Sequence, residues 1–184
     1  MPCPAHTIHA RQAHFAWDRA IPPVLAVAPG ETVTLEVADA SAGQIGPEST
    51  AAVFGAYDFD RVNPVTGPVF VEGAEPGDAL TLQLDSHCPS GWGWTALIPG
   101  FGLLADQFRE ARLRHWHYDP SGAEPLLFSD IAEIPLAPFA GTIGLAPAEP
   151  GPHGIIPPRR VGGNMDLKDL VAGSTLTLPV EVPG

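Results

Sequence analysis

Glycine and proline interrupt this chain at short intervals along its whole length, with 20 glycines and 22 prolines in 184 residues. Both residues are unfavourable inside helices, and proline also removes a backbone hydrogen-bond donor, so long helices are not expected. The two residue types are spread along the chain rather than gathered into a linker. This spacing predicts one domain over residues 1–184, built from short strands and frequent turns.

Three segments share one pattern, in which a glycine-containing turn leads into alternating residues. Glycine at the third position of a type II turn supplies the positive φ that the turn requires. In the strands that follow, Val or Leu alternates with Thr, Glu or Gln, which indicates one buried and one wet face, as in antiparallel sheets. The turn glycines are Gly30, Gly77 and Gly173, and the strands are expected at 32–37, 79–84 and 175–180.

Other segments predict further strands and little helix. One amphipathic helix is expected over 102–114, where Leu103, Leu104 and Phe108 lie near one face. A short helix near 165–170 is a second expectation. The additional strands are expected at 23–28, 67–72, 94–98 and 139–146.

Charge and composition exclude several classes of partner. The formal net charge is −12 and only nine residues are Lys or Arg, so a nucleic acid or an anionic membrane surface is not an expected partner. No run of about 18 apolar residues marks a membrane span. The first residues have neither a basic nor an apolar region typical of a signal peptide, so a cytoplasmic location is expected. Cys3 and Cys88 are expected to be free thiols there, with a disulfide between them as the alternative.

The loop that holds Gly162, Gly163, Asn164 and Asp166 is the first candidate for chemistry. Paired glycines permit positive φ and close approach of a ligand. Asn164 offers donors and an acceptor, and Asp166 offers a carboxylate, so the loop suits a metal ion or a polar substrate. The alternative is structural, with Asp166 acting as the N-cap of a helix over 167–170.

Four other groups have weaker chemical patterns. His115 and His117 would share one face of a strand, but no third metal ligand is near in sequence, so half-buried histidines are the simpler interpretation. His153 precedes the glycine pair in a loop. Asp58 and Asp60 are expected as solvated acids in a turn. Trp92 and Trp94 are expected as aromatic side chains of the core or of a pocket.

Four segments together resemble the acetamidase/formamidase family. Their order and spacing agree with the family over nearly the whole chain, and the second and fourth are long, specific strings. The segments are His14-Phe15-Ala16-Trp17-Asp18 with Ile21-Pro22-Pro23-Val24, the run 63–78, the run 141–147, and Gly162-Gly163-Asn164-Met165-Asp166 followed by Gly173-Ser174 and Leu178-Pro179-Val180.

The resemblance implies a mainly β fold of antiparallel sandwich- or barrel-like sheets with a small α/β part, and assembly into oligomers. It also implies hydrolysis of short amides such as formamide or acetamide to the acid and ammonia, assisted by a divalent metal, for which zinc is one candidate. Asp166 would be a metal ligand or catalytic carboxylate. Asn164 would orient that carboxylate or the substrate, and Gly162 and Gly163 would shape the loop.

Members of this family continue past the position of Gly184, where further site motifs are expected. The resemblance therefore implies that residues 1–184 form an incomplete domain, and the expected partners are further copies in a homo-oligomer or a complementary C-terminal chain. The alternative hypothesis is an inactive fragment that acts as a β-rich module binding a ligand or a partner.

Overall fold

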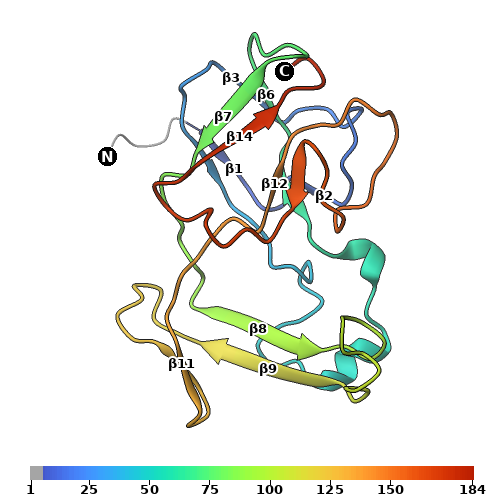
Figure 1. The fold of residues 1–184 in the computed structure, drawn as a ribbon, viewed down its shortest axis with the longest axis vertical. Coiled ribbons are helices and arrows are strands. Elements are labelled where there is room, and N and C mark those ends of the chain that lie inside the picture. The colour runs from blue at the N-terminus through green and yellow to red at the C-terminus, as the bar shows by residue number, and fades with distance from the viewer. Residues whose placement is uncertain (1–5) are drawn as a thin grey trace.

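The computed structural model describes residues 6–184, which form short strands paired two by two (Figure 1). The expected mainly β fold is confirmed, because the helices in this range are two short 3-10 turns, η1 (Ala51–Gly55) and η2 (Phe59–Arg61). Five strand pairs lie in the first and last parts of the chain. They are β1 (His6–Ile8) with β4 (Val33–Leu35), β2 (Ala13–His14) with β5 (Val65–Thr66), β3 (Leu25–Val27) with β6 (Val69–Val71), β7 (Ala79–Gln83) with β14 (Thr175–Pro179), and β12 (Thr142–Gly144) with β13 (Gly162–Asn164).

The middle of the chain forms a separate pair of hairpin-like sheets. The strand β8 (Trp92–Leu97) pairs antiparallel with β9 (Arg112–His117), and β10 (Leu126–Phe128) pairs antiparallel with β11 (Ala132–Ile134). In Figure 1 these strands lie at the end of the molecule opposite to β7 and β14. No described helix combines the length and the apolar character that crossing a membrane demands.

The three predicted glycine turns are confirmed in detail. Gly30, Gly77 and Gly173 have φ values of +90°, +103° and +86°. Each turn closes with a backbone hydrogen bond across four residues, from Glu31 N to Ala28 O, Asp78 N to Glu75 O and Ser174 N to Val171 O. Two of the strands that follow, β7 and β14, pair with each other in antiparallel register, with Leu82 opposite Leu176.

Three expectations about secondary structure are wrong. The strand after Gly30 pairs in parallel with β1, because alternation reports which face is buried and not the direction of the neighbouring strand. The helix expected over 102–114 is absent: residues 112–117 pair with β8 instead, and Leu103 is fully exposed. Gly100 and Gly102 have φ values of +76° and +94°, which are not helical, at the position where that helix would begin. The short helix expected near 165–170 is also absent.

The hydrophobic core lies in the body formed by the first and last parts of the chain. Between residues 85 and 139 no side chain is fully buried, and Cys88 is exposed in that region. The predicted pairing state of Cys3 lies outside the described residues. The buried apolar side chains are Ile8, Trp17, Val27, Ile45, Ile155, Val161, Leu170, Leu178 and Val180.

Asp39 joins the core body to the β8–β9 sheet. Its carboxylate accepts hydrogen bonds from the backbone N–H and the hydroxyl of buried Ser41, and from the N–H of Gly43 at 2.9 Å. The same carboxylate accepts from Trp94 Nε1 on β8 at 3.2 Å. A second link runs from His115 on β9, whose Nε2 lies 2.7 Å from the carbonyl oxygen of Ser49.

Replacing Asp39 with Ala should lower the free energy of unfolding by about 2–3 kcal/mol, because several donors lose a charged acceptor at once. Urea denaturation followed by tryptophan fluorescence measures this loss. Asp119→Ala is the matched control, since Asp119 accepts from the N–H and hydroxyl of Ser121 in the same local motif but reaches no other segment. Equal losses in the two variants would contradict a joining role for Asp39.

Candidate functional site

The paired glycines of β13 allow two backbones to approach more closely than any other residue permits. A Cβ atom on Gly162 would lie 2.6 Å from the carbonyl oxygen of Ile143 and 3.0 Å from Leu178 Cδ1. A Cβ on the facing Gly144 would lie 2.8 Å from the amide nitrogen of Gly163. Gly162 and Gly163 also have positive φ values, +91° and +119°. The glycines therefore permit the close packing of β12 onto β13.

Trp17 packs against the other side of this strand. Its Nε1 would lie 3.6 Å from a Cβ on Gly163, and the indole is buried. The backbone of Trp17 exchanges two hydrogen bonds with His153, at 2.9 and 3.0 Å, which ties the N-terminal segment to the loop that precedes β13. Trp17 Nε1 has no hydrogen-bond partner among the described residues.

The side-chain amide of Asn164 connects three segments. Its Oδ1 accepts from the hydroxyl of Thr142 at 2.7 Å, and its Nδ2 donates to the carbonyl oxygen of Ile156 at 3.3 Å. These two bonds assign the oxygen and nitrogen of the amide and fix its plane. Asn164 is therefore held in one orientation, with one further donor and one further lone pair left over.

Asp166 follows β13 with an exposed side chain and a left-handed backbone, φ +50°. Its N–H donates to the carbonyl oxygen of Gly141 at 3.0 Å, and its Oδ1 would lie 3.2 Å from a Cβ on Gly141. No helix follows, since residues 167–170 close only one turn, so the alternative of Asp166 as an N-cap is wrong. Among the described residues the carboxylate has no hydrogen-bond or ion-pair partner, which leaves it available to a ligand.

His14, at the end of β2, lies beside Trp17. The two ring centroids are 6.4 Å apart with the planes at 81°, and His14 Nδ1 lies 2.7 Å from the carbonyl oxygen of Ala16. Burial lowers the pKa of His14 below its ordinary value, and the bond to Ala16 opposes that shift only in part. Pattern reasoning from single segments missed His14, Trp17 and Thr142, because 120 or more residues of chain separate the first two from the glycine pair. Only their place in the family-like opening segment pointed to the first two.

The other candidates from the sequence lie apart from this site or serve packing. The ring of His153 turns to the carbonyl oxygen of Glu149, at 3.1 Å, although its backbone pairs with Trp17. His115 stacks on Trp92, and His117 is exposed. Asp58 caps η2 by accepting from the N–H of Asp60, as the expected turn implies. The described residues contain no cluster of three or more His, Cys, Asp or Glu side chains suited to a metal ion.

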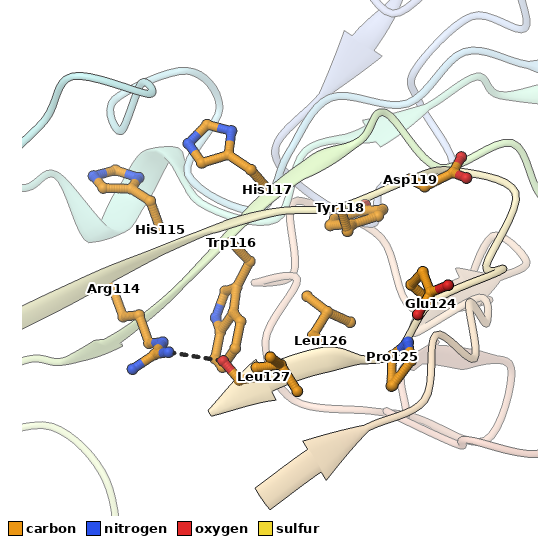
Figure 2. Close-up of a pocket in the computed structure, with 10 residues that line it drawn as sticks. All are labelled: Arg114, His115, Trp116, His117, Tyr118, Asp119, Glu124, Pro125, Leu126 and Leu127. Carbon is orange, nitrogen blue, oxygen red and sulfur yellow. Dashed lines mark hydrogen bonds between the residues drawn. The ribbon is translucent and has the colours of Figure 1, made fainter. Parts of the chain in front are cut away.

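A separate hollow lies between β9 and β10 (Figure 2). It has a volume of about 390 Å³, and Arg114 lies at one end. The guanidinium of Arg114 is 4.4 Å from the ring centroid of Trp116 and 4.6 Å from that of Phe128, and it donates to the carbonyl oxygen of Leu127. These contacts join β9 to β10, and none of the lining residues belongs to the glycine loop.

Comparison with known proteins identifies the family. The family model described as Acetamidase/Formamidase matches residues 4–153. The chain belongs to the acetamidase/formamidase family. The matched range includes His14, Trp17 and Gly144 and stops before β13.

Individual relatives of this family member extend the match over the site. A formamidase from Methylophilus methylotrophus is 27% identical over 93% of this chain and 55% of its own length. An acetamidase from Mycolicibacterium smegmatis is 26% identical over 93% of this chain and 57% of its own length. The crystal structure of an acetamidase from Bacillus halodurans has a TM-score of 0.87 and 32% identity, covering 97% of this chain and 58% of that one. The chain thus spans a little over half the length of the relatives it matches.

Gly162→Ala should lower the free energy of unfolding by about 2–4 kcal/mol, because positive φ and overlap with the Ile143 carbonyl add together. Thermal or urea unfolding measures the loss. Gly173→Ala is the matched control, since Gly173 has nearly the same φ but open space around its Cβ position. A loss as small as that of Gly173→Ala would show that β12 and β13 need not approach so closely.

The lowered pKa of His14 predicts a loss of stability in mild acid. The folded state disfavours the protonated ring, so the unfolded chain binds this proton at a higher pH, and the free energy of unfolding should fall as the pH drops below about 6.5. His14→Asn cannot titrate and should show a shallower fall between about pH 7 and pH 5. Urea denaturation at each pH measures the difference. Parallel curves for wild type and His14→Asn would contradict the prediction.

Proposed function

We propose that this family member hydrolyses the carbon–nitrogen bond of short linear amides such as formamide or acetamide and releases ammonia. The observation that carries the proposal is the match, over nearly the whole chain, to relatives named formamidase and acetamidase. The net charge of −12 also suits a neutral substrate better than an anionic one, and it does not suit nucleic acid.

Amide hydrolysis requires a group that can transfer a proton close to a polarised carbonyl. Water adds to the carbonyl carbon, the carbon–nitrogen bond breaks, and the nitrogen leaves as ammonia after taking up a proton. An exposed carboxylate without a partner can accept the proton of the attacking water and return it to the leaving nitrogen. Asp166 meets this requirement among the described residues, and Asn164, held by Thr142 and Ile156, positions the loop and offers a donor to the substrate carbonyl.

A divalent metal is part of the proposal, with zinc as one candidate. Such an ion polarises the carbonyl and lowers the pKa of a bound water. A catalytic zinc site takes three protein ligands, and the described residues offer no such cluster, so they do not form a complete metal site by themselves. Asp166 could supply one oxygen ligand. The others would have to come from outside the described residues, in a second copy of the chain or in a complementary C-terminal chain.

We also propose a cytoplasmic homo-oligomer or a complex with such a complementary chain. The exposed thiol of Cys88 suits a reducing compartment. Analytical ultracentrifugation of the purified chain measures its assembly state directly.

A second candidate function is a β-rich module that binds a ligand or a partner without turnover. The observations that favour it are the partial coverage of the relatives and the lack, within residues 6–184, of a His, Cys, Asp or Glu cluster suited to a metal ion. The two candidates differ in one measurement, ammonia release from formamide and acetamide in the presence of added zinc. Sustained release favours the hydrolase, and binding of acetamide without release favours the module.

Asp166→Asn should reduce ammonia release by a factor of about 100 or more, because Asn keeps the size of the side chain but cannot accept a proton. Since no helix depends on this side chain, the melting temperature should stay within about 2 °C of wild type. Asp169→Asn is the control, because Asp169 is an exposed acid in the turn that follows Asp166. Retention of full activity by Asp166→Asn would remove this carboxylate from the mechanism.

A further inference from the structure

One ring nitrogen of His14 makes a hydrogen bond within the protein, and the other makes none with the described residues. Nδ1 lies 2.7 Å from the carbonyl oxygen of Ala16, and a carbonyl can only accept, so Nδ1 carries the hydrogen. The neutral ring then has its lone pair on Nε2. This nitrogen makes no hydrogen bond to any residue in the range 6–184, although the ring is half-buried.

The surroundings of His14 hold the ring in place. Its backbone pairs with Val65 on β5, and its edge meets the indole of Trp17. Trp17 is in turn fixed by its backbone bridge to His153 and lies against Gly163. The imidazole therefore belongs to the same packed unit as the glycine strand, and its orientation is set by contacts on two sides.

Other histidines of the chain use their rings differently. His87, His115 and His153 each direct Nε2 to a backbone carbonyl oxygen, of Leu170, Ser49 and Glu149 respectively. The bonds of His87 and His115 connect distant segments, and that of His153 lies within one loop. None of these three rings has an acceptor left at Nε2. A purely structural His14 would be expected to do the same. In His14 a backbone carbonyl fixes the tautomer through Nδ1, and Nε2 has no partner among the described residues. Functional imidazoles have this arrangement.

Burial keeps this lone pair present at neutral pH. The pKa of His14 is lowered by burial, with the Ala16 carbonyl acting in the opposite direction, and no charged side chain contributes to the shift. A neutral acceptor of this kind suits the N–H groups of a primary amide, which are donors without a formal charge.

We propose that His14 is a substrate-binding residue whose Nε2 accepts a hydrogen bond from the N–H₂ group of a primary amide. The proposal rests on the proposed amide substrate and adds a residue and a role to that site. Its specific consequence is a preference for amides that carry an N–H on the side facing His14 over N,N-disubstituted amides, which carry no N–H.

The two amide side chains test each ring nitrogen separately. In His14→Asn the amide nitrogen can replace Nδ1 as donor to Ala16, but nothing replaces Nε2. KM for acetamide should rise about three- to tenfold, the effect of one neutral hydrogen bond, with kcat changed less. His14→Gln reaches the Nε2 position and should recover part of the loss. His153→Asn is the control and should keep the wild-type KM.

Nuclear magnetic resonance of the ¹⁵N-histidine-labelled wild-type chain gives a readout that does not need turnover. We expect His14 in the Nδ1–H tautomer at pH 7.5, with its Nε2 resonance shifting when acetamide is added and that of His153 unmoved. An Nε2–H tautomer, or no shift of His14 at saturating acetamide, overturns the inference.

The kinetic and spectroscopic results also separate this inference from the proposed function. Wild type that releases ammonia, together with His14→Asn of unchanged KM, overturns the role of His14 and leaves the hydrolase standing. Wild type that releases no ammonia overturns the hydrolase, and the acetamide titration then decides on His14 alone. If His14→Asn fails to fold, the titration of the wild-type chain remains decisive.

Discussion

The close approach of β12 and β13 is the constraint on which the rest of the site depends. Gly144 and Gly162 face each other so closely that a side chain on either would overlap the opposite backbone, and Leu178 of β14 closes the space beside them. This contact places the β12–β13 pair against the β7–β14 pair. Strands that are far apart in the sequence are thereby brought into one core, with Val161 and Leu178 buried beside the glycines.

Polar groups of the site are arranged around this apolar contact. Trp17 covers Gly163 and brings the end of β2 with it, while the bonds of Asn164 to Thr142 and Ile156 hold the loop on either side. Asp166 leaves this framework with a left-handed backbone and a carboxylate that has no partner among residues 6–184. Packing thus fixes the positions of Trp17 and Asn164 and leaves the carboxylate of Asp166 without a partner among these residues.

Local chemistry could be predicted from the sequence, and long-range neighbours could not. The positive φ of Gly30, Gly77 and Gly173 followed from turn chemistry, since no other residue adopts that backbone as easily. The helix expected over 102–114 does not form, and the end of that segment pairs with β8 as part of β9. The apolar periodicity of the segment carried no information about this pairing. The parallel pairing of β4 and the contact of Trp17 with Gly163 depend on partners distant in sequence, about which a single segment carries no information. The family-like segments identified the candidate loop, and only the fold showed which residues surround it.

The uneven distribution of the core has a consequence for the order in which the molecule unfolds. Residues 85–139 carry no fully buried apolar side chain. Their hydrogen bonds to the core body include those of Trp94 to Asp39, His115 to Ser49 and His87 to Leu170. Releasing this region exposes little additional apolar surface, so its opening costs much less than global unfolding. We therefore expect the β8–β11 region to open before the rest of the molecule, with its amides exchanging with solvent while the glycine contact and its surrounding core remain folded.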